Sequence, residues 1–132
     1  MDTKENIKTI KNLYDEFNKG NIPAILEKLH DDIIFTDAGA PEIPYAGTYK
    51  GKKGVGDFFH KMNESVEVTK FILKDILGEG STVAATGDFG IKSRKTGIAA
   101  ETEWAMFWNF ENGKPISFHS YLDTNNMSKA FK

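Results

Sequence analysis

The strongest two-residue periodicity in the sequence runs from residue 98 to residue 110. Successive side chains of a β-strand point to opposite faces of a sheet, so apolar residues at every second position predict a long strand with one buried face. Two tryptophans and a methionine make that face strongly apolar. The alternating set is Ile98, Ala100, Thr102, Trp104, Met106, Trp108 and Phe110.

Three further segments alternate in the same way, namely residues 66–73, 83–91 and 116–122. Glycine-containing turns separate them, which is typical of an antiparallel meander. In the first of these segments the apolar phase slips after Val68. The slip predicts a β-bulge near Thr69 or Lys70.

The first half of the chain instead repeats apolar residues every three or four positions, the period of an amphipathic helix. This pattern predicts a helix over roughly residues 3–19, a second that carries Ile25 and Leu29, and a third around residues 55–62. Residues 33–37 form a short predicted strand between the second helix and a loop rich in glycine and proline.

Helices followed by long antiparallel strands indicate an α+β domain with helices packed on one face of the sheet. A length of 132 residues fits one domain, covering residues 1–132. We predict three N-terminal helices packed into a curved, antiparallel, mainly four- to five-stranded sheet. Asp123 is predicted to cap a short C-terminal helix that reaches Phe131.

Composition argues against several classes of function. The 17 basic and 19 acidic side chains are scattered, so we expect no nucleic-acid partner. Without cysteine, and with three separated histidines, we expect no metal and no cofactor. The first twenty residues lack the apolar run of a signal peptide, and no stretch approaches the ~20 apolar residues of a membrane span. We therefore expect a cytoplasmic protein without a membrane partner.

Three segments together resemble the SnoaL-like branch of the NTF2-like superfamily, which includes ketosteroid isomerase. They are YDEFNKGNIPAILEKLHDDIIFTD, YKGKKGVGDFF and EWAMFWNFENGKPISFHSYLDT, and the resemblance covers nearly the whole chain. It implies a cone-shaped fold with an apolar cavity between the curled sheet and the helices, and a homodimer formed through the outer face of the sheet. The superfamily contains isomerases, cyclases, dehydratases, epoxide hydrolases and binding modules, so the fold leaves the activity open.

The resemblance also implies which side chains surround a small hydrophobic ligand. From the helices they are Leu13 or Tyr14, Phe17, Phe58, Phe59 and Met62. From the strands they are Trp104, Met106, Trp108, Phe110 and Phe118. Pro41, Pro44 and Tyr45 of the glycine- and proline-rich loop are expected to cover the entrance of the cavity.

Asp37 is the sharpest catalytic candidate. Aligned from Gly20 onward, it falls on the proton-transferring aspartate of ketosteroid isomerase. A carboxylate at the mouth of an apolar cavity is desolvated, which raises its pKa and suits a general base near neutral pH. Alternatively, Asp37 only begins the turn before Ala38 and Gly39.

The other groups that ketosteroid isomerase uses are missing. Its enolate-binding tyrosine aligns with Leu13, and its protonated aspartate aligns at or near Met106, so steroid isomerisation is disfavoured. Tyr14 lies one residue further, about 100° round the helix. Its hydroxyl reaches the cavity if the helix is rotated slightly, and otherwise lies at the rim of the core.

His119 is a second candidate, because some dehydratases of the superfamily pair a cavity histidine with an aspartate. Strand alternation favours the opposite: if Phe118 points inward, His119 faces outward with Tyr121. Two hypotheses follow. The protein is a small lyase or isomerase that uses Asp37 as its base, or it is a ligand-binding or dimerisation module without chemistry.

Overall fold

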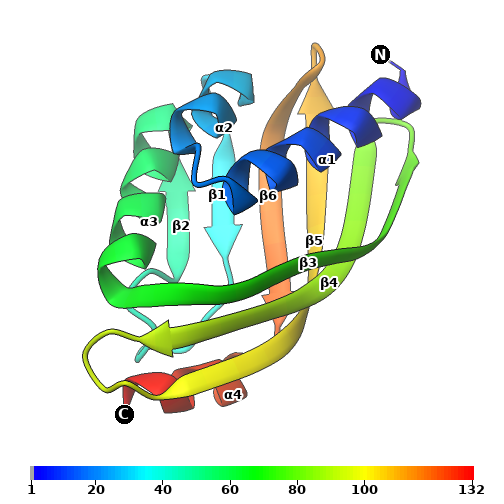
Figure 1. Ribbon diagram of the computed structural model, residues 1–132. Coiled ribbons are helices and arrows are strands. Elements are labelled where there is room, and N and C mark those ends of the chain that lie inside the picture. The colour runs from blue at the N-terminus through cyan, green and yellow to red at the C-terminus, as the bar shows by residue number, and fades with distance from the viewer. Residues whose placement is uncertain (1) are drawn as a thin grey trace.

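The computed structural model describes residues 2–132, which form a curved sheet with helices on its concave side (Figure 1). The helices are α1 (Thr3–Asn18), α2 (Ile22–Lys28), α3 (Gly51–Ser65) and α4 (Thr124–Ser128), followed by the 3₁₀ turn η1 (Lys129–Phe131). The strands are β1 (Ile34–Asp37), β2 (Gly47–Lys50), β3 (Val66–Glu79), β4 (Thr82–Ser93), β5 (Ala99–Glu111) and β6 (Lys114–Leu122). The predicted α+β class and its three N-terminal helices are confirmed.

The sheet has one strand more than the upper limit of our prediction. Within residues 2–132 the six strands follow the order β2-β1-β6-β5-β4-β3. The additional strand, β2, lies in the segment predicted to be a loop, because its four residues are too few to show a period. Strand β1 pairs parallel with β6, so the sheet is mixed and not wholly antiparallel.

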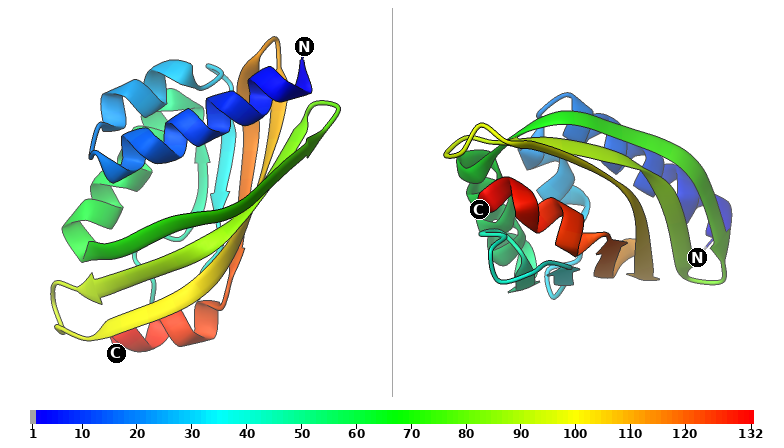
Figure 2. Two further views of the ribbon diagram at one scale, coloured as in Figure 1. Left: turned by 45° about the vertical axis from the view of Figure 1, so that its right-hand side comes forward. Right: turned by 90° about the horizontal axis from the view of Figure 1, so that it is seen from below.

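Irregular pairing between β3 and β4 curves the sheet around the helices (Figure 2). The register shifts between Val68 and Lys70, which confirms the predicted bulge, and again between Leu73 and Asp75. Bulges increase the local twist and bend of a strand. The long strands therefore enclose a concave inner face, which the helices cover.

Gly87 in β4 creates room for a large side chain on that inner face. Its cross-strand partner is Trp104 of β5. A Cβ atom at position 87 would collide with the carbonyl oxygen of Ile72 and with the indole ring of Trp104. Trp104 lies flat instead, with its ring stacked on Phe71 at a centroid distance of 5.1 Å.

Helix α1 lies across β3 and β4 and presents one apolar face to the sheet. The side chain of Asp2 accepts a hydrogen bond from the backbone N–H of Lys4 and caps the start of the helix. Gly20, with φ of +73°, follows its end in the left-handed conformation that glycine tolerates best. Both Leu13 and Tyr14 are buried on the apolar face.

The C-terminal segment closes the end of the cone opposite the β5–β6 turn (Figures 1 and 2). Asp123 accepts a hydrogen bond of 2.9 Å from the backbone N–H of Asn126, which confirms its predicted role as the cap of α4. None of the helices in residues 2–132 is both long enough and apolar enough to cross a membrane.

Candidate functional site

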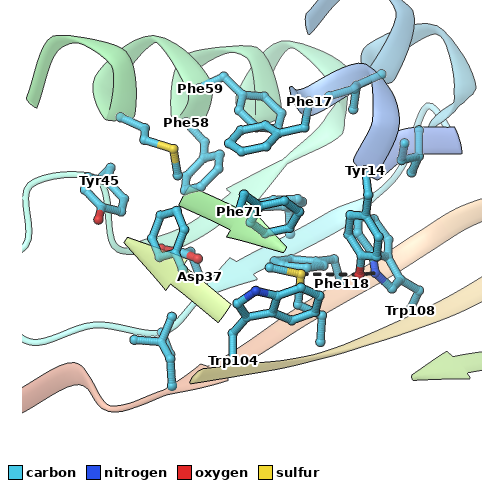
Figure 3. A pocket seen from close by; sticks show the side chains of 18 of the residues that line it. Tyr14, Phe17, Asp37, Tyr45, Phe58, Phe59, Phe71, Trp104, Trp108 and Phe118 are labelled. Atoms are coloured by element: carbon cyan, nitrogen blue, oxygen red, sulfur yellow. Dashed lines mark hydrogen bonds between the residues drawn. The ribbon is translucent and has the colours of Figure 1, made fainter. Parts of the chain in front are cut away.

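An apolar cavity of about 80 Å³ lies between the inner face of the sheet and the helices (Figure 3). Helices α1 and α3 supply one wall, and strands β5 and β6 supply the facing wall. With one exception, the side chains predicted to surround a ligand line this cavity: Leu13, Tyr14, Phe17, Phe58, Phe59, Met62, Trp104, Met106, Trp108 and Phe118.

Phe110 is the exception among the predicted lining residues. It is buried, but it does not line the cavity. The pairing of β5 with β6 shifts register between Asn109 and Phe110, next to the turn that joins the two strands. The alternation of β5 therefore continues past the part of the strand that faces the cavity.

Sequence reasoning missed several lining residues outside the three quoted segments and the long strand β5. Phe71 comes from β3, where two bulges interrupt the alternation, and Phe89 comes from the regular alternation of β4, where nothing in the sequence distinguished it as a lining residue. Tyr45 lines the cavity from the loop after β1, whereas Pro41 and Pro44 are exposed and do not. Of the three residues predicted to cover the entrance of the cavity, only Tyr45 therefore contributes to its wall.

Asp37 lies at the last position of β1 and lines the cavity with only 9% of its surface exposed. Its Oδ1 atom accepts a hydrogen bond of 3.0 Å from the hydroxyl of Ser120 in β6. No other hydrogen bond reaches this carboxyl group from residues 2–132. The backbone N–H of Ala38 donates to Ser120 instead, at 2.9 Å, so Asp37 does not act as the cap of its own turn.

Burial controls the acidity of Asp37. Loss of solvation raises the pKa of its carboxyl group from 3.8 to about 7, while the hydrogen bond from Ser120 opposes the increase. The pKa of the neighbouring Tyr45 hydroxyl is also raised, first by burial and then by the negative charge of Asp37. A carboxyl group in this state can exchange a proton near neutral pH.

Tyr14 places the second polar group of interest in the cavity. The indole N–H of Trp108 donates a hydrogen bond of 3.0 Å to its hydroxyl oxygen, and the hydroxyl donates to the sulfur of Met106 at 3.4 Å (Figure 3). The pKa of this hydroxyl is raised by burial, an effect that the bond from Trp108 opposes. The Tyr14 hydroxyl therefore lies inside the cavity and not at its rim.

His119 does not reach Asp37. It alternates with the inward-facing Phe118 and Ser120, and its ring stacks on Tyr121 at a centroid distance of 4.4 Å on the outer face of the sheet. The candidate pair of Asp37 and His119 is therefore not assembled, for the reason that strand alternation had indicated.

The largely aromatic cavity therefore contains two polar groups of interest, the carboxyl group of Asp37 and the hydroxyl group of Tyr14. In the described residues, 2–132, no three histidine, aspartate or glutamate side chains are grouped in a way that could hold a metal ion. A base and a hydrogen-bond donor around an apolar cavity can carry out proton transfer on a small organic molecule.

A groove on the helical side borders the cavity. Residues at the end of α1, on α3 and on β3 line this groove. Four side chains belong to the linings of both the groove and the cavity, namely Phe17, Phe59, Met62 and Phe71.

Several solved structures share the fold of this chain over most of its length. An NTF2-like protein from Burkholderia xenovorans LB400 superposes with a TM-score of 0.89 and 23% identity, covering 100% of this chain and 99% of the other. TerC, co-crystallised with polyporic acid, superposes with a TM-score of 0.83 and 20% identity, covering 96% of this chain and 98% of TerC. A SnoaL-like polyketide cyclase candidate from Mesorhizobium loti superposes with a TM-score of 0.72 and 19% identity, covering 86% of this chain and 96% of the other.

At the level of sequence, no protein of curated function is similar enough to count as a match. The sequence model of the SnoaL-like domain, by contrast, matches residues 10–117, which include the second half of α1, the candidate base and most of the sheet. The structural neighbours share the NTF2-like cone that this family adopts. The chain, whose fold is NTF2-like, therefore belongs to the SnoaL-like domain family.

Proposed function

We propose that this protein binds a small apolar carbonyl compound and transfers a proton at the carbon next to the carbonyl group, as an isomerase or a lyase. Asp37 is the general base, and Tyr14 donates a hydrogen bond to the carbonyl oxygen. The observation that carries the proposal is the buried carboxyl group of Asp37, with a pKa raised to about 7 and a single hydrogen-bond partner. Such a group is a competent base at neutral pH.

In the proposed reaction, the Asp37 carboxylate removes a proton from the carbon, and the electron pair moves into an enolate. The Tyr14 hydroxyl stabilises the negative charge that develops on the oxygen. Return of the proton to a different carbon completes an isomerisation, whereas departure of a leaving group completes an elimination. Either outcome requires only a base and a hydrogen-bond donor.

Ser120 is the positioning residue for Asp37. Its hydroxyl oxygen accepts a hydrogen bond from the Ala38 N–H, and the same hydroxyl donates a hydrogen bond to Asp37 Oδ1. The second carboxyl oxygen, Oδ2, is left without a protein partner in residues 2–132. This oxygen is the one we assign to the substrate proton.

The named neighbours agree with a small-molecule ligand. TerC was co-crystallised with polyporic acid, and the Mesorhizobium loti protein is described as a SnoaL-like polyketide cyclase candidate. Because both are less than 25% identical to this chain, they support the type of site and do not define the substrate.

A second candidate function is binding without catalysis. The observation that favours it is the single donor at Tyr14, since the enolate site of ketosteroid isomerase uses two donors. In this case Asp37 and Tyr14 would only orient a ligand. Proton exchange on a bound ketone separates the two functions.

We also propose a homodimer formed through the outer face of the sheet. Phe107 and Tyr121 are 44% and 52% exposed there, and their rings pack edge to face at 5.9 Å. The stacked pair of His119 and Tyr121 continues this apolar centre. A contiguous exposed apolar surface of this kind is typical of an interaction site.

The test follows the exchange of carbon-bound hydrogen for deuterium in acetophenone and cyclohexenone, measured by proton NMR in deuterated buffer. We expect exchange by the wild-type protein and a decrease of about a hundredfold or more for Asp37→Asn. Asp15→Asn, which alters an exposed aspartate on α1, is the matched control and should exchange normally. Full activity of Asp37→Asn would rule out the proposed role of Asp37.

A further inference from the structure

The hydrogen bonds around Tyr14 have a fixed direction. An indole N–H can only donate, so the Tyr14 oxygen accepts the 3.0 Å bond from Trp108. A thioether carries no proton, so the Tyr14 proton is the one in the 3.4 Å contact with the Met106 sulfur. Trp108 therefore orients the Tyr14 hydroxyl. The single proton of that hydroxyl is donated to the Met106 sulfur, which is a weak acceptor.

Met106 lines the cavity and contacts the Tyr14 hydroxyl. In the β5–β6 pair it lies directly opposite Ser120, the residue that donates to Asp37. Side chains opposite each other on one face of an antiparallel pair have Cβ atoms about 5 Å apart. A ligand atom in the position of the Met106 sulfur would therefore contact the Tyr14 hydroxyl, on the pair of strands that also carries the hydrogen-bond donor to Asp37.

The cavity is too small for a ring-sized ligand while this side chain remains in place. Its volume is about 80 Å³, whereas an engineered cavity that binds benzene measures about 150 Å³. Methionine has three rotatable side-chain bonds and adapts to different neighbours more easily than the aromatic residues around it. Movement of one thioether would enlarge the cavity and release the Tyr14 proton.

We propose that Met106 is a displaceable occupant of the ligand site, whose sulfur is exchanged for the carbonyl oxygen of the ligand at the Tyr14 hydroxyl. The proposal rests on the proposed function, because it assigns the carbonyl group to Tyr14, but it concerns binding and not proton transfer. It defines the ligand as a small ketone, enone or related carbonyl compound. Trp108 is a positioning residue for this contact.

The test compares two probes of nearly equal shape, acetophenone and α-methylstyrene, in which a methylene group replaces the carbonyl oxygen. Dissociation constants are measured by titration followed by NMR, with isotope-labelled methionine methyl groups. All proteins carry Asp37→Asn, so that no turnover occurs and loss of the proposed base cannot affect the result.

In that background we expect acetophenone to bind about two- to tenfold more tightly than α-methylstyrene, the range of one neutral hydrogen bond. The methyl resonance of Met106 should shift on binding of acetophenone. Tyr14→Phe should abolish the preference for the ketone. Met106→Leu, which keeps the volume and removes the competing acceptor, should increase the preference.

Met62→Leu is the matched control, because Met62 also lines the cavity and has no hydrogen bond to Tyr14 among residues 2–132. It should change the affinity for both probes by the same factor. The proposal is overturned if Met106→Leu and Met62→Leu act alike, if the ketone preference survives Tyr14→Phe, or if neither probe binds to the Asp37→Asn protein, with or without Met106→Leu. None of these results depends on whether Asp37 is catalytic.

Discussion

The hydroxyl of Ser120 donates a hydrogen bond of 3.0 Å to the carboxyl group of Asp37, although the two residues are 83 positions apart in the chain. The parallel pairing of β1 with β6 brings them together. Ser120 is completely buried, and its hydroxyl also accepts the backbone N–H of Ala38. The serine thereby orients one carboxyl oxygen and leaves the other for a ligand.

We expect Ser120→Ala to raise the pKa of Asp37 further above its ordinary value, because the variant loses the hydrogen bond that stabilises the carboxylate. A general base acts only when it is deprotonated. The acidic limb of the pH–rate profile for ketone exchange should therefore move to higher pH, and the rate at neutral pH should fall. Ser128→Ala removes a buried hydroxyl that donates to Asn125 and should leave the profile unchanged.

Asp37 should also make stability depend on pH. With a pKa of 3.8 in the unfolded chain and about 7 in the folded protein, the folded protein binds the additional proton between these values. The free energy of unfolding should therefore decrease as pH rises from about 4 to 7, by on the order of 4 kcal/mol from this residue.

Urea unfolding of the wild-type protein and Asp37→Asn at a series of pH values checks this expectation. The asparagine variant should gain stability relative to the wild type as pH increases, because it has no proton to lose. Asp15→Asn serves again as the exposed control. A difference between wild type and Asp37→Asn that is constant with pH would contradict the buried state of the carboxyl group.

Trp108 and Tyr14 should act as one unit in catalysis. Tyr14→Phe removes the donor to the developing negative charge and should lower kcat by about a hundredfold. Trp108→Phe keeps the Tyr14 hydroxyl but removes the hydrogen bond that orients it, so we expect a smaller decrease in kcat. The double variant should be no slower than Tyr14→Phe alone, whereas two independent structural effects would be additive. Steady-state kinetics of all three variants provide the measurement.

The outer face of the sheet should hold two subunits together. Phe107→Glu or Tyr121→Glu places a charge in the exposed apolar centre and should convert a dimer into a monomer, as measured by sedimentation velocity. Ile98→Glu is the control, because Ile98 is also 44% exposed but lies outside this centre, before the start of β5. A wild-type protein that sediments as a monomer would disprove the dimer.

Much of the fold could be predicted because the patterns are long. The alternation around Trp104 and Trp108 identified the strand and its inner face, and the phase slip after Val68 located a bulge. Strand β2 could not be predicted in this way, since its four residues, Gly47–Lys50, form a short edge strand with little burial.

The site was less accessible to prediction from the sequence. The apolar face of α1 includes both Leu13 and Tyr14, so only packing against the sheet decides where the tyrosine hydroxyl lies. A serine within a strand has no distinctive pattern, and nothing in the sequence marked Ser120 as the partner of Asp37. Both relationships join residues more than eighty positions apart.

The parallel pairing of β1 with β6 also has a consequence for the order of folding. Strands β3 to β6 are joined by short turns and can pair through local contacts, whereas β1 must close a loop that spans most of the chain. We therefore expect β1 to dock late. Until it docks, Asp37 remains in water and has the acidity of an ordinary aspartate. Recovery of proton transfer during refolding would then report the last step of assembly.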